Sequence, residues 1–450
     1  DARTPAAGAD SWSHRVEWAT AAAGGPSSDY DGMSGIGIGG RVGAGGVGSG
    51  GIADTGAAGF RTSSGGAYPT GSTGPGPLLV AAYTKGLSSY VFEDFDRDGI
   101  VDLAVTATHE AQGPSELIIH RGLGNEAYAS GVSYPTGTQT YDVAAADVNQ
   151  DGVVDLIVAN AGAGQIGTVG VHLGVGDATF LPGVTYPTGT YFGSVSVANL
   201  NDDQWPDIIA ATGATNPVIG VMFGRGNGTF GTTMDYTYTP PAGRVSSVTA
   251  GDLDGDALPD LLVATTQSNP NVVFESIGTV TVLHNLGNGT FTPSHSQSVD
   301  RNQLSMVLTD DMNGDQRRDL AFLSWGHLGL SFGSDNGAFS SVIDYPMSSY
   351  SSAFAIGDLN GDSAADLVIL DYIANQASVC LNLGDGTFGA STDYPAGYYP
   401  GAVSIGDYTG DGKPDVAVAR LATAFSSETG WVGILPGLGD GTLRVGNTTP

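Results

Sequence analysis

The chain has 450 residues and a formal net charge of −31, with 46 acidic against 15 basic residues. This balance leaves no basic footprint for nucleic acid and disfavours an anionic membrane surface as a partner. No run of about 18 apolar residues exists, so we expect no transmembrane helix, and the many glycines among Val, Thr, Tyr and Ile predict short strands and tight turns.

The N-terminal part of the chain differs in composition from the rest. Residues 24–59 are dominated by Gly, Ala and Ser, which is typical of a linker or tail, so we divide the chain into a tail at 1–57 and a folded domain at 58–450. The stretch AGFRTSSGGAYPT at 58–70 is similar to GTFGASTDYPA at 386–396, which ends a later repeat. We expect this N-terminal strand to complete the last repeat unit, although GTLRVGNTTP at 441–450 competes for the same position.

An acidic phrase recurs seven times along the rest of the chain, each time followed by a strand-like apolar run. The first copy reads EDFDRDGIVDLAV from Glu93, and the fourth reads GDLDGDALPDLLVAT at 251–265. The first acidic or amide residues of the copies lie 47 to 59 residues apart, at Asp94, Asp147, Asn199, Asp252, Asp311, Asp358 and Asp407. Self-similarity at such a period indicates a repeat architecture.

A glycine-rich phrase follows each acidic phrase, as in HLGVGDATF at 172–180 and LNLGDGTF at 381–388, and in several copies a Tyr-Pro dipeptide comes next. One period therefore predicts four short antiparallel strands joined by an acidic turn, a variable loop and a glycine-rich turn. No window has a sustained helical period. A unit of this length cannot bury both faces alone, and radial repetition makes it a propeller blade. We predict an all-β, seven-bladed β-propeller of four-stranded antiparallel blades.

The pairing of a DxDxDGxxD turn with a G-x-G-x-F turn resembles the FG-GAP, or VCBS, repeat, over about residues 58–450. That family includes the propeller of integrin alpha subunits, many secreted bacterial repeat proteins, and propeller modules of some lectins and polysaccharide-degrading enzymes. The resemblance implies a Ca²⁺ loop in each blade, with a structural role for the metal. It does not identify the ligand, because the family's propellers serve many roles.

The acidic turns themselves have the chemistry of calcium sites. Side chains at positions 1, 3 and 5 of a tight turn converge, and the carboxylate at position 9 closes the cage at the start of the next strand. Six to eight oxygens at ~2.3–2.6 Å suit Ca²⁺, and the absence of sulfur and imidazole from the phrase argues against zinc or copper. We expect up to seven Ca²⁺. The predicted ligands are Asp94, Asp96, Asp98, Asp102, Asp147, Asn149, Asp151, Asp155, Asn199, Asn201, Asp203, Asp207, Asp252, Asp254, Asp256, Asp260, Asp311, Asn313, Asp315, Asp319, Asp358, Asn360, Asp362, Asp366, Asp407, Thr409, Asp411 and Asp415.

These seven turns are unequal in charge. The turns that begin at Asp94 and Asp252 have aspartate at all four positions, whereas the third turn has the neutral Asn199 and Asn201 and should bind metal most weakly. Without metal, carboxylates in such clusters repel one another and their pKa values rise, so we expect folding and calcium binding to be coupled.

The face opposite the acidic turns is free to diversify, because it carries the segments that lead into the first strands and the variable loops. Eight residues before the first position of each turn stand Gly86 and six candidate ligand-binding residues, Gln139, Tyr191, Arg244, Gln303, Tyr350 and Tyr399. Aromatic rings with Gln and Arg suit sugars, although the tyrosines could instead pack between blades. The loops add the contact candidates His109, Glu110, Glu275, Trp325, His327, Arg420 and Trp431.

These features favour a secreted or cell-surface, calcium-stabilised propeller that binds carbohydrate or an extracellular protein as an adhesion module, without catalysis. The numbered chain starts at Asp1 rather than at methionine, as removal of a secretion signal would leave it. One alternative is a polysaccharide lyase or hydrolase on the same scaffold, whose catalytic residues the sequence does not identify. Another is a self-assembling filament or surface-layer subunit, in which the strand at 58–70 inserts into a neighbour's open blade.

Overall fold

The computed structural model describes residues 77–445, apart from short segments within that range: 84–85, 109–113, 125, 161–166, 189–193, 202, 212–217, 232–235, 241–243, 269–275, 300–303, 305, 325, 335–336, 349 and 422–429. Every helix or strand assigned in these residues is a β-strand, and none of the described residues forms a helix long and apolar enough to cross a membrane. The strands form seven four-stranded antiparallel sheets and one short ribbon.

We number the sheets one to seven by the chain order of their innermost strands, from β2 in sheet one to β28 in sheet seven. Sheet one contains β2 (Gly86–Glu93), β3 (Asp102–Thr108), β4 (Pro114–His120) and β7 (Val132–Thr138), and the ribbon β5 (Gly122–Gly124) and β6 (Ala127–Tyr128) lies beside it. Sheet two contains β8 (Thr140–Ala146), β9 (Asp155–Asn160), β10 (Thr168–His172) and β11 (Val184–Pro187). Sheet three contains β12 (Ser194–Ala198), β13 (Asp207–Ala211), β14 (Ile219–Met222) and β15 (Tyr236–Tyr238).

The next three sheets repeat this order. Sheet four contains β16 (Arg244–Gly251), β17 (Asp260–Ser268), β18 (Ser276–Asn285) and β19 (Phe291–Val299). Sheet five contains β20 (Met306–Asp310), β21 (Asp319–Ser324), β22 (His327–Ser331) and β23 (Ile343–Pro346). Sheet six contains β24 (Ser351–Gly357), β25 (Asp366–Asp371), β26 (Gln376–Cys380) and β27 (Thr392–Pro395).

Sheet seven closes the ring with strands from both ends of the described chain. It contains β28 (Ala402–Gly406), β29 (Asp415–Arg420) and β30 (Gly430–Leu435), and its outer strand is β1 (Leu78–Tyr83), which pairs with β30. Closure by an N-terminal strand was expected, but the expected segment 58–70 was wrong, because Leu78–Tyr83 occupies the outer position. Residues 1–57 and 58–70 lie outside the described residues, and Leu443 of the competing C-terminal segment bridges to Gly437 instead.

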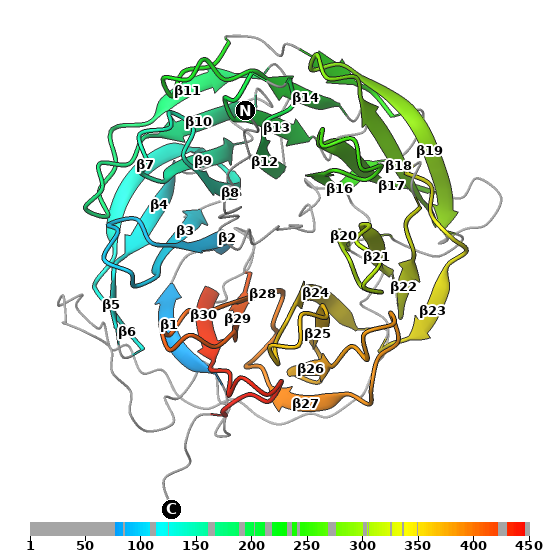
Figure 1. The fold of residues 1–450 in the computed structure, drawn as a ribbon. Coiled ribbons are helices and arrows are strands. Elements are labelled where there is room, and N and C mark those ends of the chain that lie inside the picture. The colour runs from blue at the N-terminus through cyan, green and yellow to red at the C-terminus, as the bar shows by residue number, and fades with distance from the viewer. Residues whose placement is uncertain are drawn as a thin grey trace, which may run out of the picture.

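The sheets are arranged radially around one axis, with the first strand of each sheet nearest to it (Figure 1). The predicted seven-bladed all-β propeller is therefore confirmed. The register is the same in every sheet: the position-9 aspartate begins the second strand and pairs with the residue before position 1, as Glu93 pairs with Asp102 and Gly357 with Asp366. Each acidic turn thus connects two residues that are paired with each other across the first and second strands.

The core lies between neighbouring sheets, since the second strands are buried on both faces. All seven residues of β3 are buried. Val91 and Leu117 of sheet one pack in one cluster with Val143 and Leu156 of sheet two. A buried Val or Leu side chain stabilises the fold by roughly 1.5–3 kcal/mol relative to exposure, so these contacts set the spacing of the blades.

Tyr-Pro dipeptides link several outer strands to the next sheet, as the first two copies show. The ring of Tyr134 packs edge-on against Phe180 with ring centres 5.9 Å apart, and its hydroxyl accepts a 3.3 Å hydrogen bond from the Phe180 N–H. Tyr186 makes the same two contacts with Phe230 of sheet three. The tyrosines of these Tyr-Pro dipeptides therefore join neighbouring blades.

Candidate functional site

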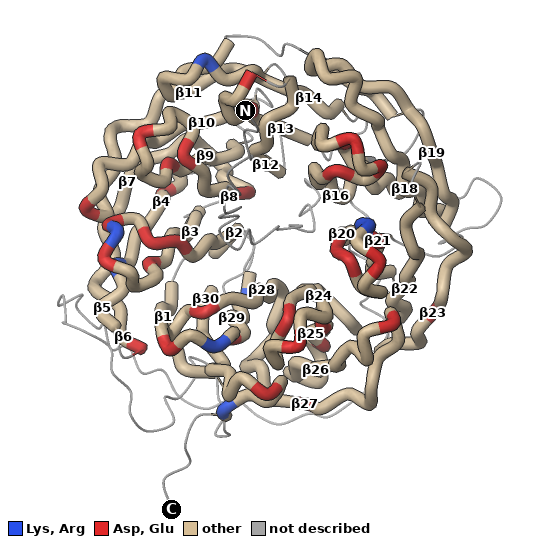
Figure 2. Tube along the Cα trace, in the orientation of Figure 1, with Lys and Arg blue, Asp and Glu red and all other residues tan. Residues whose placement is uncertain are grey.

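In the six acidic turns whose fourth and sixth residues are both described, both of these residues have positive φ angles. Acidic residues accompany the inner strands of the sheets (Figure 2). In sheet one, Arg97 and Gly99 at positions 4 and 6 have positive φ angles of 62° and 81°. This coil points backbone N–H groups at the side chains. Asp98 N–H donates to Asp94 Oδ1 at 3.1 Å, Gly99 N–H to Asp94 Oδ2 at 2.9 Å, and Ile100 N–H to Asp98 Oδ1 at 2.8 Å.

The position-9 aspartate has a role that the sequence did not predict. Asp102 Oδ2 accepts a 2.9 Å hydrogen bond from the Phe95 N–H at position 2, and Oδ1 accepts one of 2.7 Å from the Gly122 N–H that begins the glycine-rich turn. The equivalent carboxylates make the same two bonds in the other sheets: Asp155, Asp207, Asp260, Asp319, Asp366 and Asp415. Each therefore clamps the two turns of its sheet together.

Burial perturbs these clamping carboxylates. Burial raises the pKa of Asp102, Asp155, Asp260 and Asp415 to about 6, while the backbone hydrogen bonds act in the opposite direction. It also raises the pKa of Asp319 and Asp366. A charge that is costly to bury and clustered with others is what a cation would stabilise.

The turns that have four aspartates bring carboxylates within reach of one ion. Oxygens of Asp94, Asp96 and Asp102 lie within 4.8 Å of one another, and so do oxygens of Asp252, Asp254 and Asp260. Two oxygens bound to one Ca²⁺ can be at most about 5 Å apart, since each bond is ~2.3–2.6 Å. These two sets of three carboxylates therefore fit a calcium-sized ion.

The third turn, which has asparagine at positions 1 and 3, provides a separate test of the fit. Asn199 Oδ1 is buried and accepts no hydrogen bond, whereas Asp358 at the same position in sheet six accepts a 2.7 Å bond from the Gly361 N–H. A buried oxygen without a partner costs about 1–3 kcal/mol. A cation in this turn would supply the missing partner.

Four tyrosines form a row at the opposite end of sheets six and seven. The ring centre of Tyr350 lies 5.7 Å from that of Tyr372, Tyr372 lies 6.2 Å from Tyr399, and Tyr399 lies 4.1 Å from Tyr398. The Arg420 guanidinium carbon lies 5.5 Å from the Tyr398 ring centre and 5.4 Å from that of Tyr399. We call Tyr350, Tyr372, Tyr398 and Tyr399 the tyrosine row.

Local backbone bonds hold the tyrosine row in place. Tyr399 has a left-handed backbone with φ 52°, and its N–H donates a 2.8 Å hydrogen bond to Asn375 Oδ1 in the turn between β25 and β26. Tyr372 N–H donates to the Tyr350 carbonyl at 3.2 Å. Left-handed backbone is unfavourable for a residue with a Cβ, by about 1–2 kcal/mol, so the turn at Asn375 must compensate for it.

The other residues predicted from the sequence to contact a ligand do not all lie on the exposed surface. Gln139 lies in the bend before β8 with φ 54°, and Arg244 begins β16, with its side chain outside the described part. Trp431 is only 1% exposed and Arg420 only 4%, so their predicted role as surface contacts is wrong. His327 Nδ1 lies 3.0 Å from Asp344 Oδ1. The candidates Tyr191, Gln303, His109, Glu110, Glu275 and Trp325 lie outside the described residues.

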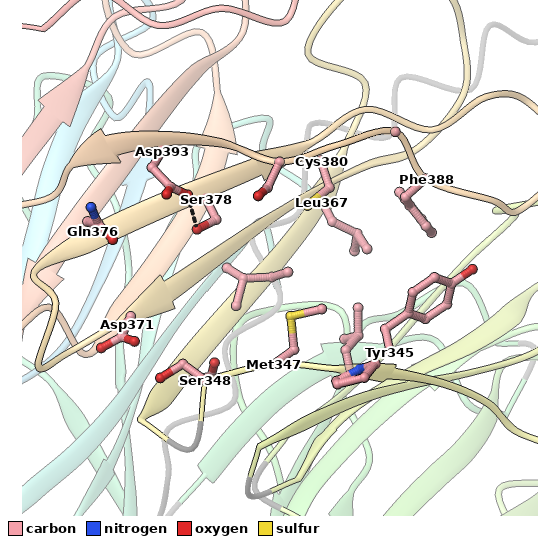
Figure 3. A pocket seen from close by; sticks show the side chains of 16 residues that line it. Tyr345, Met347, Ser348, Leu367, Asp371, Gln376, Ser378, Cys380, Phe388 and Asp393 are labelled. Carbon is pink, nitrogen blue, oxygen red and sulfur yellow. Dashed lines mark hydrogen bonds between the residues drawn. The ribbon is translucent and has the colours of Figure 1, made fainter.

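A cavity of about 420 Å³ opens between sheets five and six (Figure 3). Apolar side chains gather at one end of the cavity, where Tyr345 and Met347 lie near Leu367 and Phe388, and polar side chains gather at the other end. The polar lining residues include Ser348, Ser351, Asp371, Gln376, Ser378 and Asp393. Ser348 Oγ accepts a 3.1 Å hydrogen bond from the Tyr350 N–H, and Asp371 directly precedes Tyr372, so the cavity and the row are contiguous.

Comparison with protein families identifies the repeat. A model described as FG-GAP-like repeat matches residues 94–158, 199–263, 311–369 and 358–418, which together make up more than half of the chain. The chain belongs to the FG-GAP repeat family. A second model of the family, the FG-GAP repeat, matches residues 244–283 of this FG-GAP protein, and the matches together include the acidic turns of all seven sheets.

Similar solved structures exist, whereas no curated protein matches the chain. One of these structures is that of an Agrocybe aegerita lectin that specifically recognises non-reducing terminal N-acetylglucosamine. It is 16% identical in sequence, covers 76% of this FG-GAP chain and 87% of its own, and has a TM-score of 0.47.

Sequence reasoning missed two parts of the FG-GAP protein's surface. Tyr372 and Asn375 lie in a turn of only four residues between β25 and β26, a loop from which no contact residue was predicted. Their signal was the tyrosine itself, which stands just after a strand on the face that already had Tyr350 and Tyr399. The cavity had no local signal, because its walls come from two sheets.

Proposed function

We propose that this FG-GAP protein is an extracellular, calcium-stabilised propeller that binds carbohydrate on the face that has the tyrosine row. The observation that carries the proposal is the row itself, four neighbouring aromatic rings beside a cavity that several polar residues line. Tyr350 is 42% exposed, so at least one ring offers a free face to solvent. A sugar ring stacks its apolar C–H surface on such a face while its hydroxyls form hydrogen bonds around it.

The cavity beside the row supplies suitable hydrogen-bonding groups. Asp393 Oδ1 accepts a 2.7 Å hydrogen bond from Ser378 Oγ, and Asp371 Oδ1 accepts bonds from two backbone N–H groups, so both carboxylates are held in fixed orientations (Figure 3). Oriented carboxylates and the Gln376 amide can receive and donate hydrogen bonds to sugar hydroxyls. Arg420 is buried against the rings of Tyr398 and Tyr399, so it would not touch a sugar directly, but its positive charge would favour an acidic sugar over a basic one.

Calcium enters the proposal as a structural ion in the acidic turns. The residues at positions 1, 3, 5 and 9 would hold it through oxygen, as the clustered carboxylates and the unpartnered Asn199 Oδ1 support. When bound, the ion neutralises the carboxylates and stiffens the link between the first and second strands. Extracellular modules bind Ca²⁺ with dissociation constants of about 10⁻⁴–10⁻³ M, which suits a secreted or surface-bound protein.

A glycan array followed by titration calorimetry tests the binding function. We expect the parent protein to bind a set of oligosaccharides, and Tyr350→Ala and Tyr399→Ala to weaken that binding at least about tenfold, or 1.4 kcal/mol. Leu383→Ala is the matched control, since Leu383 is 68% exposed but lies in the glycine-rich turn of sheet six. Binding that survives both tyrosine substitutions would reject this site, and release of shortened oligosaccharides would favour an enzyme.

A further inference from the structure

One position beside the acidic turn is occupied by a different type of residue from sheet to sheet. In each sheet, one backbone N–H at or just after the end of the third strand donates to Oδ1 of the clamping aspartate, and the position in question directly precedes that residue. It is Arg121, before Gly122, in sheet one, and His284, before Asn285, in sheet four. The equivalent residues in the other five sheets are apolar: Leu173, Phe223, Phe332, Leu381 and Pro436. The two basic residues thus accompany the two turns that have aspartate at all four positions.

In sheet one the basic residue is an internal counter-charge. Arg121 Nε lies 2.5 Å from Asp96 Oδ2, and Arg121 Nη2 lies 3.2 Å from Asp98 Oδ2. Its hydrogen bonds to Asp98 and Asp96 raise the pKa of Arg121, so the guanidinium stays charged. A guanidinium has no lone pair to offer a metal. Arg121 therefore neutralises part of the cluster and competes with any cation that enters it.

In sheet four the residue at this position can itself be a ligand. His284 Nδ1 lies 2.9 Å from Asp254 Oδ2 and 3.3 Å from Asp260 Oδ1. Ligand atoms of Asp254, Asp256 and His284 lie within 4.8 Å of one another. The His284 side chain is 29% exposed and that of Asp254 19%, so the group is partly shielded from water. Neutral imidazole nitrogen is a common ligand of Zn²⁺ and other transition metals, whereas Ca²⁺ takes oxygen ligands.

We infer that the acidic turn of sheet four is a mixed nitrogen–oxygen site that takes a divalent transition-metal ion, such as Zn²⁺, through His284, Asp254 and Asp256. This inference rests on the proposed role of the acidic turns as metal sites, and it assigns one of them a different ion. The acidic phrase contains no imidazole, which is why the sequence pointed to oxygen ligands at every turn. β17 begins directly after the acidic turn, and its pairing with β18 places Leu283 opposite Leu261, so His284 at the end of β18 lies beside the turn.

The test is Zn²⁺ binding by the full chain, first stripped of divalent ions with chelator and then returned to excess Ca²⁺. We expect calorimetry to show one Zn²⁺ site in the parent protein and at least about tenfold weaker binding in His284→Phe. Phenylalanine is the matched replacement, because sheets three and five have Phe223 and Phe332 at this position. Arg121→Leu, which copies sheets two and six, should leave Zn²⁺ binding unchanged. Co²⁺ should give a d–d absorption band that only the variants retaining His284 show.

Two results would overturn the inference: equal Zn²⁺ binding by the parent and His284→Phe, or no Zn²⁺ binding by the parent. His284 would then be only an ion-pair partner of Asp254. Thermal unfolding in Ca²⁺ checks that His284→Phe is folded, and His284→Leu is the second variant. If Ca²⁺ fails to stabilise the protein but His284-dependent Zn²⁺ binding is found, the proposed calcium role fails and this inference stands. The reverse pattern rejects this inference alone.

Discussion

Ser89 Oγ on β2 donates a 2.9 Å hydrogen bond to Asp142 Oδ1 on β8, which ties sheet one to sheet two. The other carboxylate oxygen of Asp142 accepts a 3.0 Å bond from the Val195 N–H on β12, so one side chain joins three consecutive sheets. Asp142 is 1% exposed, and burial raises its pKa to about 7, while the hydrogen bonds from Val195 and Ser89 lower it. The tie is therefore sensitive to pH.

Asp142→Asn should remove a pH dependence of stability. The folded protein holds the Asp142 proton up to about pH 7, whereas the unfolded chain releases it near pH 4, so the folded state binds more protons in between. The stabilising contribution of Asp142 is complete below about pH 4 and is lost as the pH rises to about 7. Between these limits we expect the parent to lose on the order of 2–4 kcal/mol relative to Asp142→Asn. Urea unfolding at a series of pH values measures the difference, and parallel curves would contradict it.

The local part of this architecture was readable from sequence. The position-9 aspartate begins the second strand in every sheet, because the acidic turn and the apolar run after it lie in one continuous segment. The seven repeats in the sequence were also enough to predict seven blades. The tyrosines at Tyr350 and Tyr399 were predicted to lie on the loop face, and the structure places them together through Tyr372.

The long-range part was not readable. The closing strand Leu78–Tyr83 has neither an acidic turn nor a Tyr-Pro dipeptide, so the motif-like 58–70 was preferred over it. Asp142 stands in the middle of a first strand, and its partners come from two other sheets. Likewise, Arg121 and His284 lie at strand ends whose proximity to the acidic turns depends on register, which a phrase search cannot supply.

The clamping aspartate should matter for stability even without metal. We expect Asp366→Ala to cost about 2–4 kcal/mol in chelator, since it leaves the buried N–H groups of Leu359 and Asn382 without their carboxylate. Asp362→Ala, in the same turn, should cost about 1 kcal/mol or less, because its contacts are exposed. Denaturant unfolding of the two variants in chelator measures both costs. Equal losses would mean that position 9 serves as a metal ligand alone.

Asn199→Asp should lower the stability of the fold without calcium and raise it with calcium. In chelator, the added charge joins a turn that already has Asp203 and Asp207, and we expect lower stability. In Ca²⁺ the new carboxylate should strengthen the site, and a site at tenfold excess over its dissociation constant stabilises the fold by about 1.4 kcal/mol. Thermal unfolding of parent and variant in chelator and in Ca²⁺ gives the comparison. A variant whose shift has the same sign in both buffers would argue against metal in this turn.

Removing β1 should open the propeller at sheet seven. The Tyr83 side chain is 8% exposed, its hydroxyl lies 2.9 Å from His120 Nε2 of sheet one, and β1 covers the edge of β30. A chain that starts at residue 84 should therefore lose several kcal/mol relative to one that starts at residue 77, by the burial lost at about 25 cal/mol per Å². It should also self-associate, because an uncovered strand edge pairs with other chains.

A peptide covering residues 77–85 provides the decisive comparison for this closure. Added to the chain that starts at residue 84, it should restore the melting temperature and the monomeric elution volume, since strand addition supplies the missing backbone hydrogen bonds and the Tyr83 side chain. A scrambled peptide of the same composition serves as the control, because it offers the same hydrophobicity without the register of Ala82 opposite Trp431. If both peptides act alike, or if the shortened chain melts where the longer one does, then β1 does not close the ring and the stability of sheet seven must come from its three C-terminal strands.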